Sequence, residues 1–219
     1  MADSNARGQT ASRLGAVLIV LAIVMLIALL PRRYQLVPTP YAYAAAAAML
    51  LPMIVVGLSR GNALWRRFER IAEFGAVAIA LTFNSANLFV AAYNLVENPG
   101  KLEPVPLFYT SVGIWTGNIL IFTLIYWLVD RGGPDARLNR EPHYPDFDFP
   151  AMDDPAKVPP NWQPGIIDYL FLGFTTSTAF SPTEAMPLSA RAKLLMVVQS
   201  AISLITIAIV AARTINILK

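Results

Sequence analysis

Long apolar blocks constrain this chain more than any other feature. Five of them together hold about half of the 219 residues, at 14–30, 41–58, 71–96, 107–129 and 194–218. A bilayer core about 30 Å thick is crossed by roughly 20 helical residues, with a range of about 17 to 25. The blocks have about that length, and only 14% of all residues are charged. The sequence therefore predicts a polytopic helical membrane protein.

The segments between the blocks suggest how the chain is organised. The expected fold is all-α, with five transmembrane helices and one short re-entrant half-helix before the last of them. The expected parts are a cytoplasmic tail (1–13), a four-helix membrane bundle (14–129), an acidic, proline-rich surface strap (130–165), and the half-helix with the last membrane helix (166–219). A cleaved signal peptide is the alternative for the first block, but no Ala-x-Ala site follows it.

Basic residues predict the orientation of the bundle. The connection 59–70 is the richest group, with four arginines beside Trp65 and Phe68. With a cytoplasmic N-terminus, most of the 17 Lys and Arg residues lie inside, whether or not the short block 166–181 crosses the bilayer. We therefore expect a multi-pass protein of the cell membrane with a cytoplasmic N-terminus. The side of the C-terminus stays open, although the short length of the block favours re-entry.

Several function classes are excluded or disfavoured by composition. The net charge of +3 arises at the ends of apolar blocks, so membrane topology explains it and we expect no nucleic-acid partner. The chain has no cysteine, which excludes disulfides, thiolate metal sites and thiol nucleophiles. No phosphate-binding glycine loop or hydrolase motif is present either. We expect no cofactor, no metal and no enzyme activity, and a membrane enzyme using Asp168, Glu73 or the strap is only a third hypothesis.

The third expected helix carries a polar stripe. Asn84, Asn87 and Asn94 recur at helical spacing, so they share one face. Polar groups inside a bilayer must face protein or water, because lipid cannot bond them. The stripe is therefore either interhelical hydrogen-bonding that holds the bundle together or the lining of a hydrated pathway, with Asn84 and Asn87 as pathway candidates.

The last expected helix carries a second stripe of the same kind. Gln199, Ser203, Thr206 and Arg213 follow at steps of four, three and seven. The first three are candidates for lining a pathway, with hydrogen-bonded packing again as the alternative. Arg213 lies close enough to the helix end to reach the membrane surface, so a structural role competes with a pore or substrate role.

The short block 166–181 is the least ordinary segment, because it is too short and too polar for a comfortable span. Asp168 opens it, where a carboxylate would stabilise the positive end of a helix dipole. Cation binding is the alternative role for Asp168.

Three threonines near the end of this block are further pathway candidates. Thr175, Thr176 and Thr178 resemble the Thr-Thr-x-Thr stretch of potassium channels, at the end of a short helix that precedes a longer one. The four residues that follow, 179–182, contain no glycine, whereas a carbonyl-lined filter uses glycine to reach its backbone angles. A potassium-type filter is therefore not expected, and the threonine hydroxyls could simply bond the preceding turn of their own helix.

The strap contains an Asp-Phe-Asp-Phe-Pro sequence that allows two interpretations. Asp146 and Asp148, with further acids at 153 and 154, could hold a hard cation, which needs several oxygen ligands. The spacing is not that of an EF-hand, so packing of Phe147 and Phe149 at the membrane surface is the favoured interpretation.

The order of these segments resembles a family of uncharacterised bacterial integral membrane proteins, a domain of unknown function. The family's activity is not established, so the resemblance implies a membrane architecture and no particular reaction. A histidine expected early in the family's last helix is absent here, where Gln199 is among the polar residues. The resemblance rests on the arginine-rich connection, on Phe147-Asp-Phe-Pro150, on Asp168-Tyr-Leu-Phe-Leu-Gly-Phe-Thr175, and on the last helix, which has a basic start at Arg191 and Lys193 and ends near Asn216.

Two functions follow as expectations. The first is a channel-like protein or transporter for a small ion or solute, in the lipid bilayer and as a homo-oligomer, lined by the half-helix and the two polar stripes. The alternative is a non-transporting membrane subunit or scaffold, whose stripes are packing and whose arginine-rich connection binds a partner or anionic lipid.

Overall fold

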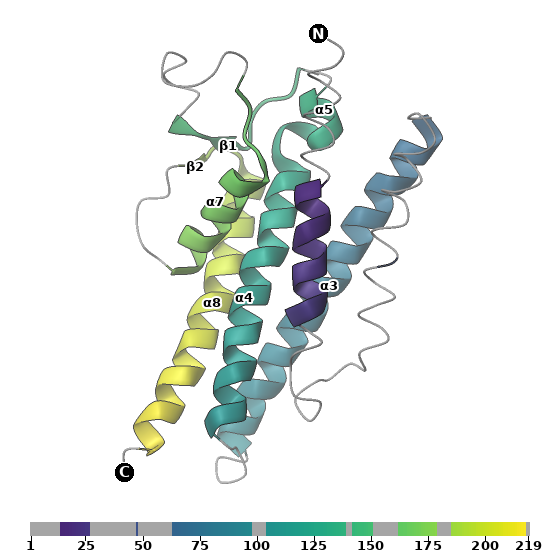
Figure 1. Ribbon diagram of the computed structural model, residues 1–219. Coiled ribbons are helices and arrows are strands. Elements are labelled where there is room, and N and C mark those ends of the chain that lie inside the picture. Colours follow the sequence, from purple (N-terminus) through teal and green to yellow (C-terminus); the bar gives the residue numbers. More distant parts are fainter. Residues whose placement is uncertain are drawn as a thin grey trace.

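The computed structural model describes residues 14–26, 47, 63–97, 104–138, 142–150, 162–178 and 185–217. The expected tail, almost all of the second block and the acids at 153 and 154 lie outside these residues. Within them the chain is mostly helical, which confirms the all-α prediction (Figure 1).

Three long helices and one shorter apolar helix make up the described body of the molecule. They are the N-terminal helix Leu14–Leu26, α3 (Ala63–Glu97), α4 (Pro104–Val129) and α8 (Ala190–Ile217). Among the described residues, three segments are long and apolar enough to cross a membrane: Arg70–Glu97, Val105–Gly132 and Ala190–Ala212. The described part of the N-terminal helix is shorter, and almost all of the second block lies outside the described residues, so the prediction of five spans stays a prediction.

Two helices begin earlier than the apolar blocks predict. α3 starts at Ala63, so the described part of the arginine-rich connection is helical and not a loop. α4 starts at Pro104 and includes Pro106 in its first turn. Proline is tolerated there because the first N–H groups of a helix have no partner within the helix. The described arginines and prolines before these apolar blocks therefore lie within the helices and do not end them.

The described part of the strap is not uniformly extended. It contains the single 3₁₀ turn η3 (Asp130–Gly132), the five-residue helix α5 (Pro134–Leu138) and the short strand β1 (Phe147–Asp148). No long helix occurs in the described parts of 130–165, as the prolines predict. β1 pairs antiparallel with β2 (Met186–Pro187), with Phe147 opposite Pro187.

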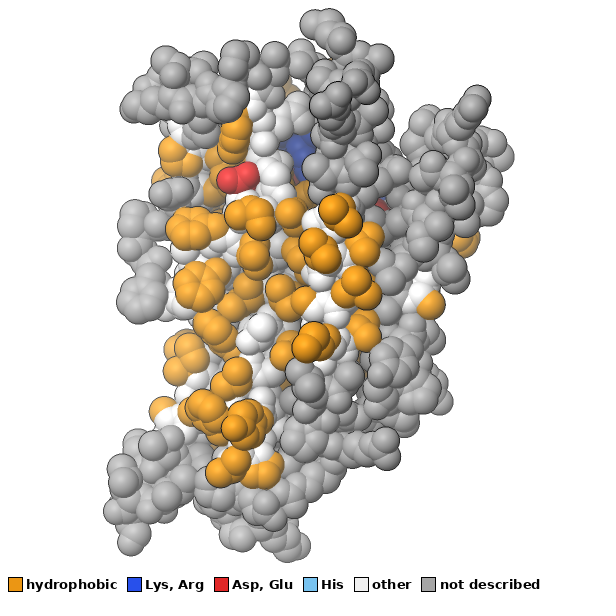
Figure 2. Space-filling view, viewed as in Figure 1, with side chains coloured by type: hydrophobic (Ala, Val, Ile, Leu, Met, Phe, Trp, Pro, Cys, Tyr) orange, Lys and Arg blue, Asp and Glu red, His pale blue; other side chains and the backbone are white. Residues whose placement is uncertain are grey.

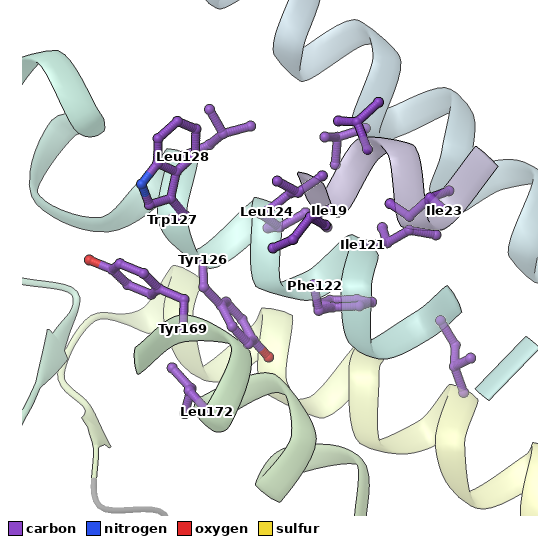
Figure 3. Close-up of a cluster of buried hydrophobic side chains, with 14 of the residues drawn as sticks. Ile19, Ile23, Ile121, Phe122, Leu124, Tyr126, Trp127, Leu128, Tyr169 and Leu172 are labelled. Carbon is purple, nitrogen blue, oxygen red and sulfur yellow. The ribbon is translucent and has the colours of Figure 1, made fainter. Parts of the chain in front are cut away.

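α4 is the central helix. It packs against α3, α7 (Ile166–Thr178) and α8, and its second half is buried on every side. A helix that is apolar all round is expected to be covered by others. Figure 3 shows Tyr126 of α4 against Tyr169 and Leu172 of α7, and Ile19 and Ile23 of the N-terminal helix against Ile121 and Leu124 of α4.

α7 has 13 residues and lies beside one end of the bundle (Figure 1). It begins where α4 ends and α8 begins (Figure 1). Its last turns are bonded to Gln199 and Ser200, about a third of the way along α8. A Cβ on Gly15 would overlap Ile166, and Arg70 donates to the main-chain oxygen of Gly132. The starts of α3, α7, α8 and the N-terminal helix therefore lie at one end of the molecule, together with the described part of the strap.

The exposed side chains along the bundle are largely apolar. Figure 2 shows hydrophobic side chains over the described part of one face, with the few visible charged groups towards the upper end. This distribution suits helices that face lipid. The exposed large apolar residues include Phe89, Tyr93, Phe108, Ile167, Phe171, Leu194, Val197 and Leu204.

Candidate functional site

Two polar clusters hold α7 in place. The first, here the interfacial cluster, lies at its start and comprises Asp130, Arg137, Asp146, Tyr169 and Arg191. The second, here the amide cluster, lies at its end and comprises Asn118, Tyr126, Ser177, Gln199 and Ser203. Both join α7 to α4 and α8, so together they form the candidate site.

Asp130 is the centre of the interfacial cluster. Its side chain is fully buried, and its Oδ2 accepts a 2.6 Å hydrogen bond from the Tyr169 hydroxyl. Its Oδ1 accepts from the backbone N–H groups of Asp146 (2.8 Å) and Phe147 (3.4 Å). Hydrogen bonds to a carboxylate are the stronger kind, so one side chain fixes the end of α4, the strap and the first turn of α7 together.

A tight turn after Asp130 redirects the chain. Arg131, Gly132 and Gly133 have φ values of 50°, 76° and 97°. Glycine reaches this left-handed region at little cost, whereas Arg131 does not. The turn brings Arg137 back, so that its Nη1 donates to the main-chain oxygen of Asp130 at 2.7 Å.

Arg137 is a buried cation beside two aromatic rings. Its guanidinium carbon lies 5.3 Å from the centre of the Tyr169 ring and 5.9 Å from that of Trp127. Burial lowers the pKa of Arg137 below its ordinary value, while Tyr169 and Asp130 act in the opposite direction. The aromatic faces and the Asp130 charge thus compensate a cation that water barely reaches.

Asp146 joins the strap to the start of α8. Both of its carboxylate oxygens accept hydrogen bonds from Arg191, and Ser189 donates to the same carboxylate. Its main-chain oxygen accepts from the N–H of Leu188 at 2.8 Å. Burial raises the pKa of Asp146, but the bonds from Arg191 and Ser189 outweigh this and hold the pKa below its ordinary value of 3.8.

The phenylalanines of the strap pack as the favoured interpretation predicts. Phe147 and Phe149 are buried, with ring centres 5.0 Å from Tyr126 and 5.6 Å from Tyr169 respectively. Asp146 is already bonded to Arg191. Among the described residues there is no group of three or more His, Asp or Glu side chains that could hold a metal ion.

Gln199 is the centre of the amide cluster. It is fully buried on α8, and its Nε2 donates to the main-chain oxygen of Gly173 (2.7 Å) and to Ser177 Oγ (2.8 Å). Its Oε1 accepts from the Tyr126 hydroxyl of α4. One carboxamide therefore connects all three helices at the last turns of α7.

Asn118 extends the amide cluster along α8. Its Nδ2 donates to the main-chain oxygen of Gln199 at 3.0 Å and to Ser203 Oγ at 2.8 Å. Thr206, one turn further, is also buried and donates to the oxygen of Ile202 on its own helix. The predicted stripe of Gln199, Ser203 and Thr206 therefore faces the bundle interior, where its first two members are hydrogen-bonded across helices.

The threonines of α7 bond within their own helix. Thr175 and Thr176 donate to the oxygen of Leu172, at 3.1 and 2.7 Å, and Thr178 donates to the oxygens of Phe174 and Thr175. Thr175 and Thr176 are buried and Thr178 is half-buried. The structure thus shows the alternative interpretation: the threonine hydroxyls donate to the preceding turn of their own helix.

Close packing of α7 depends on Gly173. A Cβ at this position would stand 3.0 Å from Thr123 Oγ1 and 3.2 Å from the oxygen of Ile119, both on α4. Small residues allow membrane helices to approach in this way. Gly173 also supplies the carbonyl that Gln199 binds, so the same residue serves both neighbours.

Asp168 occupies the first turn of α7. Its Oδ2 accepts a 2.6 Å hydrogen bond from the N–H of Gly165, immediately before the helix. This geometry is that of an acid that caps a helix start. It supports the helix-terminus interpretation of Asp168 over the cation-binding one.

The asparagine stripe of α3 faces α4 at Asn84. Asn84, Asn87 and Asn94 are all half-buried, and Asn84 lies against Gly117 of α4, next to Asn118 of the amide cluster. The side chain of Arg213 lies outside what the structure describes.

Sequence reasoning missed seven residues of the two clusters as functional candidates: Asn118, Tyr126, Asp130, Arg137, Tyr169, Ser177 and Arg191. A lone Asn in an apolar helix and an Asp followed by two glycines at a helix end are signals that could have drawn attention to Asn118 and Asp130. Their partners lie up to 85 positions away in the chain, so spacing alone does not reveal them.

The chain matches no family model, no curated protein and no solved structure. The resemblance to a family of bacterial membrane proteins therefore stays a prediction.

Proposed function

We propose that the protein is a multi-pass protein of the cell membrane that forms a channel-like or transporter pathway for a small ion or solute, with α7 as a re-entrant half-helix. The observation that carries this proposal is the position of α7. It starts at the end of the bundle where α8 starts, and its Gly173 and Ser177 are bonded to Gln199, about 14 Å along α8 from Ala190 at 1.5 Å per residue.

A helix that ends inside a bilayer has a chemical consequence. Its last carbonyl groups carry the negative end of the helix dipole, which favours a cation nearby. Membrane transporters use the ends of broken helices for this purpose. The proposal therefore favours a small cation, with the pathway formed between α7 and neighbouring segments in a homo-oligomer.

The roles of the predicted lining residues change in this proposal. Gln199 and the threonines use their hydrogen-bond donors within the protein, and Ser203 accepts from Asn118. We therefore assign them to holding the helices together rather than to direct contact with the ion. Asn84 and Asn87 stay candidates for the lining, because both are half-buried on a face of α3 that meets α4 at Asn84.

Flux measurements test the proposal. The purified chain is reconstituted in lipid vesicles, and the flux of Na⁺, K⁺, H⁺ and Cl⁻ is followed with ion-sensitive dyes. We expect cation flux that falls in Gln199→Leu and is retained in Val197→Ala, a matched change on the exposed side of α8. Absence of flux for every ion, or equal flux in both variants, would contradict it.

Orientation has its own test, because the chain has no natural cysteine. Single cysteines are introduced at Ser4, Lys101 and Lys219 and probed in intact cells with a thiol reagent that does not cross the membrane. A cytoplasmic N-terminus with five spans and a re-entrant α7 predicts labelling at positions 101 and 219 and protection at position 4. Labelling at position 4 would reverse the proposed orientation.

A non-transporting membrane subunit is the second candidate. It is supported by the interhelical bonds of Gln199 and Asn118, which show two polar side chains used for packing. Native mass spectrometry of the protein extracted in mild detergent distinguishes the two functions. A stoichiometric partner chain favours the subunit, and a partnerless homo-oligomer favours the pathway.

A further inference from the structure

One turn of α4 collects buried polar atoms that lack a hydrogen-bond partner within the described residues. They are Asn118 Oδ1, Trp115 Nε1 and, from α3, Asn84 Nδ2. Asn84 belongs to the same level, since its Oδ1 is 2.9 Å from the point where a Cβ on Gly117 would stand. The turn lies near the middle of the candidate span, about 15 to 20 Å from Val105. We call Trp115, Asn118 and Asn84 the mid-membrane layer.

The Asn118 carboxamide cannot be reversed to satisfy its oxygen. Its Nδ2 points to the main-chain oxygen of Gln199, which can only accept a hydrogen bond. Exchanging the nitrogen and oxygen would bring two acceptors together. Asn118 is fully buried, so its Oδ1 stays an acceptor that needs a donor from outside the described residues.

The three atoms together define the chemistry of what could satisfy them. Trp115 Nε1 and Asn84 Nδ2 carry N–H groups and need an acceptor, whereas Asn118 Oδ1 needs a donor or a cation. A metal cation would satisfy only the oxygen, and an anion only the two N–H groups. Small neutral molecules that both donate and accept can satisfy each of the three.

We propose that the mid-membrane layer binds ordered water molecules. Water has the required donor and acceptor groups, and a buried water typically makes about three hydrogen bonds. Lipid offers no replacement, because it cannot bond polar groups in the bilayer core. The layer binds water whether or not the protein transports anything, so this inference does not depend on the proposed function.

The water layer adjoins the end of the half-helix. The Trp115 ring packs edge to face on Phe174 of α7, with ring centres 6.0 Å apart. Asn118 binds the backbone of Gln199, which in turn holds Gly173 and Ser177. Water bound in the layer is therefore connected to the last turns of α7 through Trp115 and through Asn118 and Gln199.

Hydrogen exchange at the tryptophan indoles tests the proposal directly. The full chain is labelled with ¹⁵N at its four tryptophans, placed in lipid nanodiscs and transferred to D₂O, and the loss of each indole N–H signal is followed by NMR. Trp115→Phe and Trp127→Phe assign the two signals. Trp127, which is 1% exposed, is the buried reference.

We expect the Trp115 N–H to exchange about 100-fold faster than that of Trp127, because a bound water can remove the proton without unfolding of the bundle. Equal protection of the two indoles would overturn the proposal, since it would mean a dry layer or a partner from another segment of the chain.

A substitution gives an independent measurement. Asn84→Leu replaces a buried amide by an apolar side chain of similar size. In a dry layer this removes an unpaired N–H and raises the melting temperature. In a hydrated layer it removes a ligand of the water and lowers the melting temperature, which is the result we expect. Thr82→Val, an exposed change on α3 whose hydroxyl bonds its own helix, is the control and leaves the melting temperature unchanged.

Discussion

The interfacial cluster and the amide cluster hold the same half-helix by different chemistry. At the start of α7, the bonds are made by charged groups, with Asp130 near Arg137 and Asp146 paired with Arg191. At its end, the bonds are made by neutral carboxamides and hydroxyls. Charge is therefore kept at the end of the bundle and neutral polarity is used in its interior, where a charge would cost most.

The two clusters also differ in how fully their polar atoms are hydrogen-bonded. The described interfacial groups compensate one another, and the carboxylates of Asp130 and Asp146 accept several hydrogen bonds each. The interior retains an unpaired oxygen at Asn118. The start of α7 is thus expected to be the stronger attachment, and the end the more adaptable one. Four predictions test this difference.

The largest effect is expected at Asp130. Asp130→Ala leaves Arg137 buried without its counter-charge and removes the acceptor of the Tyr169 hydroxyl, so the free energy of unfolding falls by about 3 to 5 kcal/mol. Asp130→Asn keeps an acceptor oxygen and loses the charge, and its effect is smaller. Thermal unfolding of both variants in detergent provides the measurement, and equal losses would show that the charge is irrelevant.

Gln199→Leu is expected to weaken the other attachment by less. It removes the donor to Gly173 and Ser177 and the acceptor of Tyr126, at a cost of about 2 kcal/mol, since hydrogen bonds between membrane helices are individually modest. Hydrogen exchange by mass spectrometry should show faster exchange in 166–178 and little change in 104–129. Ser200→Ala, which removes one bond of 3.3 Å to α7, is the control with little effect.

Packing at the end of α7 is tested with two glycines. Gly173→Ala forces α7 away from Thr123 and lowers the free energy of unfolding by about 1 to 2 kcal/mol. Gly75→Ala meets no atom within 4 Å and raises helix propensity, so it is expected to stabilise α3 by up to about 1 kcal/mol. We expect a lower melting temperature for Gly173→Ala and a higher one for Gly75→Ala. A lower melting temperature in both variants would contradict the explanation by close packing at Gly173.

The smallest effect is expected from acid at the interfacial cluster. The pKa of Asp146 is held below 3.8, so its pair with Arg191 stabilises the fold fully above about pH 5 and is lost as the pH falls through the folded pKa. Arg191 is largely exposed, so solvent screening limits the effect to about 1 kcal/mol. Melting temperatures from pH 6 to pH 3 should fall more in the natural chain than in Asp146→Asn.

Local periodicity predicted part of this arrangement. The spacing of Gln199, Ser203 and Thr206 placed them on one face, and that face is buried. Length and threonine content identified 166–181 as a short helix, of which 166–178 is helical in the structure. These features depend on neighbours within a few turns, which a single sequence displays.

The interhelical pairs were not predictable in the same way. Asp130 and Tyr169 are 39 positions apart, and Asn118 and Ser203 are 85 apart, so nothing local connects them. The acids of the strap were considered as possible cation ligands. In the structure Asp146 is instead bound by Arg191, a residue that the sequence analysis had related only to membrane orientation. Helix packing decides which polar side chains meet. That packing depends on all helices of the bundle together, so no single segment of the sequence reveals it.

The position of the anchors along the chain has a consequence for biosynthesis. Arg191 and Gln199 follow α7, so the half-helix leaves the ribosome before the residues that fix it. Asp130 and Asn118 are already present by then, which allows α7 to meet α4 first and to be locked only when α8 inserts. A chain truncated before residue 190 and released from the ribosome should therefore carry a half-helix that is accessible to protease, and a chain that continues through residue 217 should protect it.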